Sequence, residues 1–182
     1  MPRLSVCRED DTKIICELND QILLGTEGRS DKPPRITARA IVRNQDGLYA
    51  VMYADKWKLY SLPGGGVEPG EDVLAALRRE VWEETGCTCD AVQELGVVTE
   101  NRASLDYTQI NHYYMVTTDH APLENHLTPA EEASRTAVQW HPLEEAVRLI
   151  TAQHFDRVQG KYLQARDVAA LQAYMAMLKA DA

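Results

Sequence analysis

Two hydrophobic runs of β-type composition, ITARAIV (36–42) and LYAVMYA (48–54), predict neighbouring β-strands in the first half of the chain. The segment NQDG (44–47) between them is typical of a hairpin turn. Three later stretches have the same strand-like character, at about 91–100, 107–118 and 135–141. The pattern therefore predicts a sheet that draws strands from most of the chain.

Helical periodicity is strongest in DVLAALRREVWEETG (72–86). Asp72 can cap the start of this helix, and Gly86 can end it in a left-handed conformation. An apolar stripe of Leu74, Leu77 and Val81 is expected to face the sheet.

Two further helices are expected near the end of the chain. PLEEAVRLI (142–150) has Pro142 near its first turn, where proline is favoured. RDVAALQAYMAMLKA (166–180) is amphipathic. Its apolar stripe is Val168, Leu171, Met175 and Leu178.

The remaining segments suggest how the domain is organised. KIICELNDQILLG (13–25) is expected to form a small hairpin that turns at Asn19-Asp20, and SLPGGGVEPGE (61–71) is expected to be a loop rather than regular structure. We predict an α/β fold, a mixed β-sheet sandwiched between helices, with an N-terminal β extension at 1–34. The main domain, 35–182, ends in the C-terminal helix.

Charge and hydropathy exclude some classes of function. The net charge of −9 over 182 residues opposes binding to a nucleic-acid duplex, and it also repels a small phosphorylated substrate unless cations intervene. No apolar run approaches the roughly 20 residues of a membrane span, so no membrane partner is expected. The first residues lack the apolar core of a signal peptide, so a cytoplasmic location is expected. A homodimer is left open.

Three glutamates of the central helix, Glu80, Glu83 and Glu84, fall on one edge of the helical wheel. Their mutual repulsion destabilises the helix, and Arg78 and Arg79 lie elsewhere on the wheel. Such an edge is either a solvated acidic surface or a site for Mg²⁺ or Mn²⁺, which prefer hard oxygen ligands. The preceding Pro63-Gly64-Gly65-Gly66 favours the cation site, since its bare backbone can approach both metal and phosphate.

Loop and helix together resemble the signature of the Nudix (MutT-like) hydrolase family, G-x5-E-x7-R-E-U-x-E-E-x-G-U, where U is a bulky apolar residue. The matching residues are Gly65, Glu71, Arg79, Glu80, Val81, Glu83, Glu84 and Gly86. Cys87 is a small hydrophobe at the last position and departs slightly from the pattern. The resemblance extends over roughly residues 35–150 and implies a Nudix fold.

The resemblance also implies a division of roles. Glu80, Glu83 and Glu84 would bind metal ions with the carbonyl of Gly64, and Arg79 would hold a glutamate, either Glu71 or Glu80. Water would attack phosphorus in a nucleoside diphosphate linked to a variable group X. The alternative is a catalytically silent Nudix-fold module that binds or senses a nucleotide.

The general base is open among four glutamates. Glu80 and Glu84 lie on the helix, whereas Glu131 and Glu132 lie in LTPAEEA (127–133), which is expected to be a loop before the last strand. An exposed polar loop with no catalytic role is the other interpretation of Glu131 and Glu132.

The substrate is less well defined than the reaction. Gly65 and Gly66 can approach phosphate, and Trp57, Tyr60 and Tyr114 can stack on a base. Packing is an equally valid role for Tyr60. Markers of known Nudix subfamilies are missing, since Arg102 and Ala103 stand where ADP-ribose hydrolases commonly carry proline. The small nucleotide-type substrate is therefore not identified further.

Overall fold

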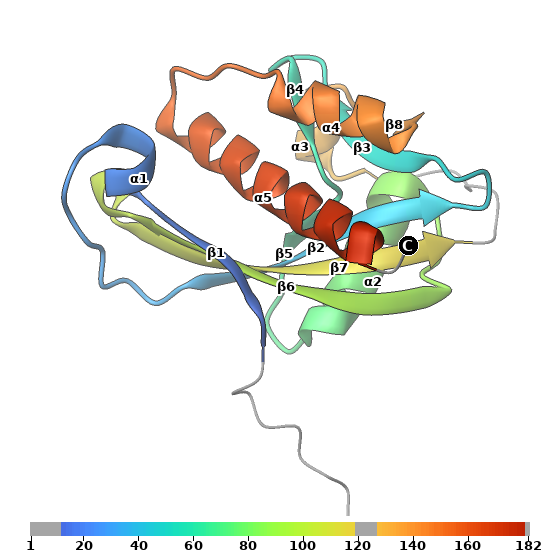
Figure 1. Ribbon diagram of the computed structural model, residues 1–182, viewed down its shortest axis with the longest axis horizontal. Coiled ribbons are helices and arrows are strands. Elements are labelled where there is room, and N and C mark those ends of the chain that lie inside the picture. Colours follow the sequence, from blue (N-terminus) through green and yellow to red (C-terminus); the bar gives the residue numbers. More distant parts are fainter. Residues whose placement is uncertain (1–11, 119–126, 181–182) are drawn as a thin grey trace, which may run out of the picture.

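A mixed β-sheet organises the molecule in the computed structural model, which describes residues 12–118 and 127–180 (Figure 1). Its strands are β1 (Ile14–Asn19), β2 (Arg35–Asn44), β3 (Tyr49–Ala54), β4 (Leu59–Ser61), β5 (Gly64–Gly66), β6 (Ala91–Arg102), β7 (Tyr107–Thr118) and β8 (Thr136–His141). The main order is β1-β6-β7-β2-β3-β4, while β5 pairs with β2 and β8 pairs with β3. The β1–β6 and β2–β7 pairs are parallel and the others antiparallel, which confirms the expected mixed sheet.

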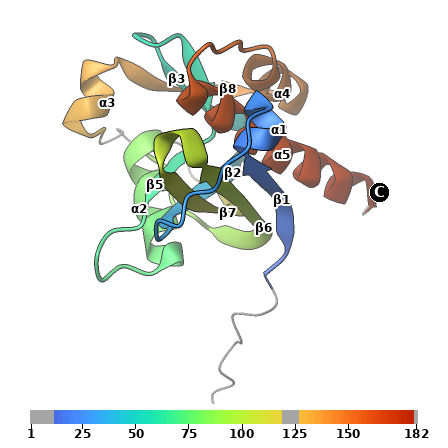
Figure 2. The same ribbon diagram turned by 90° about the vertical axis from the view of Figure 1, so that its left-hand side faces the viewer.

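Helices cover both faces of this sheet (Figure 2). They are α1 (Asp20–Leu24), α2 (Val73–Thr85), α3 (Pro129–Ala133), α4 (Leu143–Thr151) and α5 (Val158–Ala180), and a 3₁₀ turn spans Ala103–Leu105. One apolar core lies between the sheet and α2, and a second lies between the sheet and the α4–α5 pair. The sandwich predicted from the sequence is confirmed.

The central hairpin and the glutamate helix form as their local signals predict. Arg43 pairs with Tyr49, and the side chain of Asn44 accepts hydrogen bonds from the backbone N–H groups of Asp46 and Leu48. Helix α2 begins after Asp72, whose carboxylate accepts a hydrogen bond from Ala75 N at 2.7 Å. It ends at Gly86, which has φ +69°.

The glycine segment is more regular than expected. Gly64, Gly65 and Gly66 form β5 and pair antiparallel with residues 37–39 of β2. An added Cβ at Gly64 would meet the backbone of Ala38 and Arg39. The strand forms because glycine removes that obstacle, so the expectation of a loop without regular structure was wrong for these three residues.

Two of the predicted apolar stripes were partly wrong. Leu77 and Val81 are fully buried against the sheet, but Leu74 is 46% exposed. Leu178 near the end of α5 is 38% exposed. Helix α5 begins at Val158 instead of 166, and its buried face is Tyr162, Arg166, Asp167, Ala170, Leu171 and Tyr174.

The expected N-terminal hairpin was also wrong. Strand β1 ends at Asn19, whose side chain accepts a hydrogen bond from Ile22 N at 2.9 Å and so caps the short helix α1. Asp20 is buried, and its carboxylate accepts hydrogen bonds from Ser104 N and Tyr162 OH. The Asn-Asp pair therefore starts a helix, and β1 joins the main sheet beside β6. The domain boundary at 34/35 stays a prediction.

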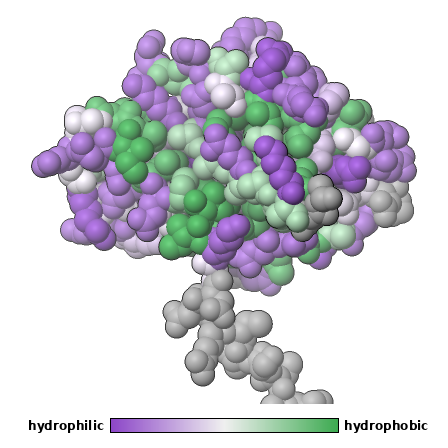
Figure 3. All heavy atoms as spheres, viewed as in Figure 1, coloured by the Kyte–Doolittle hydropathy of each residue, from purple (hydrophilic) through white to green (hydrophobic). Residues whose placement is uncertain are grey.

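The surface retains apolar side chains in this N-terminal part. Ile14 is 56% exposed and Ile22 is 61% exposed. Figure 3 shows apolar areas interspersed with polar ones on the side that carries β1, α1 and α5. Within the described ranges, none of the helices is long and apolar enough to cross a membrane. The homodimer stays a prediction.

Candidate metal-binding and catalytic site

The site is built where the edge of α2 meets the glycine loop (residues 62–67). Gly65 lies so close to Glu80 that an added Cβ would stand 2.6 Å from the carboxyl carbon. Gly64 has φ +131°, and its N–H donates to Glu84 Oε2 at 2.6 Å. The missing side chains therefore let two carboxylates of α2 touch the backbone of the loop.

Arg79 connects the carboxylates to one another. Its Nε and Nη2 donate to Glu71 at 3.0 Å each, and its Nη1 donates to Glu80 at 2.8 Å and to Glu83 at 3.1 Å. Nη2 also donates to the carbonyl of Gly66 at 3.0 Å. The planar guanidinium suits this set of acceptors. The wheel placed Arg79 away from the glutamates, but its long side chain reaches back to them.

These five residues form what we call the edge cluster: Glu71, Arg79, Glu80, Glu83 and Glu84. Burial raises the pKa of Glu84 well above the usual range of a glutamate, although the bond from Gly64 opposes this. Burial also raises the pKa of Glu80, with Arg79 opposing. The hydrogen bond from Arg79 lowers the pKa of Glu71. Three of the four carboxylates thus share one guanidinium and the fourth, Glu84, is held by the Gly64 N–H, so the cluster holds more acidic groups than basic ones.

The donor set fits a hard divalent cation. Carboxylate and carbonyl oxygens are the ligands that Mg²⁺ and Mn²⁺ take. Within the described residues no three acidic, histidine or cysteine side chains converge into a ready-made cation site. The carboxylates instead turn toward Arg79 and Gly64. A cation would therefore draw Glu80 and Glu83 from Arg79.

Glu131 lies within electrostatic reach of this cluster, because its charge contributes to the raised pKa of both Glu80 and Glu84. The segment around it is not a loop but the short helix α3. Thr128 and Glu131 form a capping box, in which the Glu131 carboxylate accepts from Thr128 N at 2.7 Å. Glu132, the next residue, is exposed.

The three aromatic candidates for base stacking lie in different surroundings. Tyr114 is only 7% exposed and belongs to the core beneath α2. Tyr60 packs against Tyr53 with ring centroids 4.7 Å apart. Trp57 is 56% exposed at the turn between β3 and β4. The structure thus does not gather the three around the glycine loop, and their part in substrate binding stays a prediction.

Arg35 was missed by the sequence reasoning. It is exposed at the first position of β2, and its Nη2 lies 2.6 Å from where a Cβ on Gly66 would be. It makes no hydrogen bond or ion pair that the described part of the chain reveals. A basic residue at the start of β2 was the available signal, but only the pairing of β2 with β5 brings Arg35 close to Gly66.

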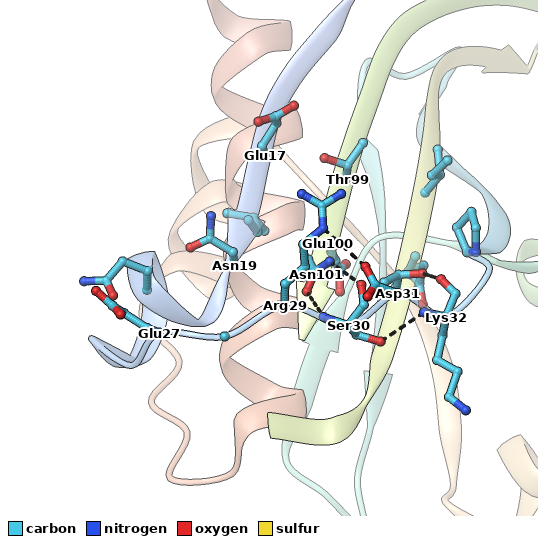
Figure 4. Close-up of a pocket in the computed structure, with 17 residues that line it drawn as sticks. Glu17, Asn19, Glu27, Arg29, Ser30, Asp31, Lys32, Thr99, Glu100 and Asn101 are labelled. Carbon is cyan, nitrogen blue, oxygen red and sulfur yellow. Dashed lines mark hydrogen bonds and ion pairs between the residues drawn. The ribbon is translucent and has the colours of Figure 1, made fainter. Parts of the chain in front are cut away.

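An open pocket of about 720 Å³ lies on the N-terminal side of β2 (Figure 4). Its walls come mainly from β1, β6, β7 and the connector at 27–34, and most of the residues that line it are of polar type. Ser30 N donates to Asn101 Oδ1, and Asn101 Nδ2 donates back to Ser30 O, both at 2.9 Å. The pocket reaches Pro34, next to Arg35, but none of the predicted site residues lines it.

Comparisons of the sequence with known proteins identify its relatives. The family model for the NUDIX domain matches residues 33–163. An RNA pyrophosphohydrolase of Rhodopseudomonas palustris (strain BisA53) is 32% identical over 77 residues, which are 38% of this chain and 43% of the relative. The chain thus spans less than half the length of that curated relative.

Two solved structures resemble the fold. A NUDIX hydrolase from Nitrosomonas europaea gives a TM-score of 0.57 at 21% identity, over 79% of this chain and 90% of that chain. An ADP compounds hydrolase gives a TM-score of 0.59 at 20% identity, over 84% and 77%. At these identities the likeness concerns the fold, and it confirms the predicted fold class.

Proposed function

Because the chain belongs to the Nudix family, we propose that it is a metal-dependent pyrophosphohydrolase acting on a nucleoside diphosphate linked to another moiety. The observation that carries this proposal is the edge cluster beside the glycine loop. Three carboxylates share one arginine there and a fourth accepts a hydrogen bond from Gly64 N, at a place where bare backbone faces the cluster. A purely structural cluster would be expected to balance its charges.

The residues that would hold the cation are Glu80, Glu83 and Glu84, with the Gly64 carbonyl as a fourth oxygen donor. Mg²⁺ is the proposed ion, and Mn²⁺ is an alternative because it takes the same ligands. When bound, the ion would offset negative charge on the diphosphate and lower the pKa of a bound water.

The chain's own groups have separate tasks in this proposal. Arg79 keeps the carboxylates in position, and the Gly66 backbone and Arg35 face the phosphates. The oxygen of water bonds to phosphorus while the bridging P–O bond breaks, and the departing phosphate keeps the electron pair. The proton of the attacking water passes to a carboxylate of the protein.

Glu131 is our choice for this general base. Glu80 and Glu84 are engaged as metal ligands in the proposal, which disfavours proton uptake by either. Glu131 is close enough to influence both, and Arg79 does not hold it. Glu132 is exposed, so solvent screens its charge more effectively.

Glu131→Gln tests the base sharply, because glutamine also satisfies a capping box and so preserves α3. We expect kcat to fall by about 100-fold or more, within the range typical of general-base catalysis, with KM and Mn²⁺ affinity unchanged. Glu132→Gln is the matched control and should keep wild-type kcat. Equal kcat values for the two variants would remove Glu131 from the mechanism.

The reaction itself is tested with a panel of nucleoside diphosphate derivatives, assayed with Mg²⁺ and again with EDTA. The panel includes RNA with a 5′ pyrophosphate, because a relative is named RNA pyrophosphohydrolase. We expect release of a phosphorylated product from at least one member, abolished by EDTA. Tight binding of one member without any turnover would favour the nucleotide-sensing module instead.

A further inference from the structure

The backbone of Leu62, the first residue of the glycine loop, forms hydrogen bonds with two side chains that are distant in the sequence. Its backbone N–H donates to Asp167 Oδ2 at 3.0 Å, and its carbonyl accepts from Arg39 Nη1 at 3.5 Å. Leu62 is 2% exposed, so water cannot satisfy these groups. The backbone just before Gly64 thus depends on α5 and β2 for its hydrogen bonds.

Asp167 is itself held in place on the buried face of α5. It is fully buried, and its Oδ1 accepts a hydrogen bond from Tyr113 OH at 2.6 Å. The guanidinium Nε of Arg166 lies 3.5 Å from the same oxygen. With Oδ1 fixed by these neighbours, Oδ2 is presented to Leu62.

Asp167 belongs to a chain of buried charges that we call the interior row: Arg39, Asp167, Arg166, Glu100 and Arg102. Arg166 Nη1 lies 3.6 Å from Glu100, and Arg102 Nε donates to Glu100 at 2.7 Å. Opposite charges alternate along the row, which limits the cost of burying them. In the part of the chain described, the Nε atoms of Arg39 and Arg166 are nevertheless buried without a hydrogen-bond partner. Burying these two donors without a partner destabilises the fold, so we look for a function of the interior row other than stability.

Arg39 connects this row to the edge cluster. Burial lowers the pKa of Arg39, and the nearby positive charge of Arg166 lowers it further. The negative charges of Asp167 and Glu84 act in the opposite direction and raise it. Arg39 therefore lies within electrostatic reach of Asp167 in the interior row and of Glu84 in the edge cluster. It is also the residue of β2 that pairs with Gly64, whose N–H holds the Glu84 carboxylate.

We propose that Asp167 and Arg39 are positioning residues that fix the backbone at Leu62 and thereby set Gly64 and the Glu84 carboxylate for metal binding. The C-terminal helix thus takes part in the site without touching substrate. The inference rests on the proposed function, since it assigns the glycine loop to catalysis.

The test compares the wild-type chain with Asp167→Asn and Tyr174→Phe. Asparagine keeps the size of the side chain but loses the charge and one acceptor. Tyr174→Phe removes a different buried hydrogen bond of α5, the 2.9 Å bond between the hydroxyls of Tyr174 and Tyr49, and so controls for helix docking. Amide hydrogen exchange at Leu62 and Gly64 is measured by NMR, and Mn²⁺ affinity by calorimetry.

For Asp167→Asn we expect exchange at both amides to be at least about tenfold faster, because their local opening becomes easier. Mn²⁺ affinity should fall by about 10- to 100-fold, the range for residues that orient metal ligands, and kcat should fall with little change in KM. Tyr174→Phe should leave all of these at wild-type values. If Asp167→Asn does not fold, Tyr113→Phe loosens Asp167 more gently and should give a smaller shift in the same direction.

Unchanged exchange and Mn²⁺ affinity in Asp167→Asn, or equal losses in Tyr174→Phe, would overturn the positioning role. If the loop responds as expected but the wild type hydrolyses no member of the panel, the positioning stands and it is the proposed reaction that fails.

Discussion

The edge cluster and the interior row combine the same kinds of charged side chain, but the first has an excess of acidic groups and the second does not. In the edge cluster, three glutamates share Arg79 and are partly exposed, while the buried Glu84 accepts a hydrogen bond from Gly64 N. In the interior row, two acids alternate with three arginines and are closed off beneath α5. An excess of carboxylates draws cations from solution, whereas in the interior row each carboxylate already lies between two arginines. The comparison therefore separates residues for chemistry from residues for structure, with Arg39 and Asp167 between them.

The largest expected effect follows from Glu84→Gln. It removes a charged ligand from the edge cluster, and kcat should fall by more than about 100-fold, beyond the usual effect of changing an outer-shell partner. Stability should be kept, because a neutral amide replaces a buried carboxylate whose charge is disfavoured. Steady-state kinetics and urea unfolding check this, with exposed Glu144→Gln as the control. Retention of half the wild-type turnover would contradict the metal site.

Glu100→Gln is the corresponding substitution in the interior row. It should lower stability and leave turnover nearly unchanged. It leaves Arg102 and Arg166 without their shared acid, at a cost of about 3 kcal/mol in the free energy of unfolding. Turnover per folded molecule should stay within about twofold, because Glu100 does not touch the glycine loop. A loss of turnover as large as that of Glu84→Gln would show that the two groups are not separate.

Arg35→Gln should have a smaller effect, confined to substrate binding. Loss of a charge-assisted contact to phosphate corresponds to a KM about tenfold higher, with kcat nearly unchanged. Arg43→Gln removes another exposed arginine of β2 and serves as the control. A fall in kcat alone would place Arg35 outside phosphate binding.

The smallest expected effect is a pH dependence of stability without metal. Burial raises the pKa of Glu80 in the folded state above the ordinary value of 4.5. The folded protein therefore holds this proton over a pH range in which the unfolded chain releases it. Wild type should lose stability relative to Glu80→Gln as pH rises from about 4.5 through the folded-state pKa. Urea unfolding in EDTA at pH 5 and 8 measures this difference, and the opposite sign would refute the raised pKa.

Local signals explain what the sequence could predict. The caps at Asp72 and Gly86, the turn at 44–47 and the spacing of Glu80, Glu83 and Glu84 act over a few residues, so they can be recognised without knowing the fold. Two local signals were overlooked. Asn19 is a helix cap, and Thr128-Pro129 with Glu131 is a capping box.

The interior row depends on long-range partners and could not be predicted in the same way. Leu62 and Asp167 are separated by 105 residues, and only the packing of α5 on the sheet brings them together. Hydrophobic periodicity placed Leu178 on the buried stripe of α5, although it is 38% exposed, and it omitted Arg166 and Asp167, because it cannot recognise paired charges as buried. Arg166 and Asp167 occupy that face because each finds its opposite charge there.

The central claim is that the edge cluster takes a divalent cation and the interior row does not. Calorimetric titration of Mn²⁺ into wild type, Glu84→Gln and Glu100→Gln, with Mg²⁺ as competitor, tests it directly. We predict Mg²⁺-competed binding to wild type and to Glu100→Gln with equal affinity, and an affinity at least about tenfold weaker for Glu84→Gln. No binding to wild type, or equal weakening in the two variants, would contradict the account.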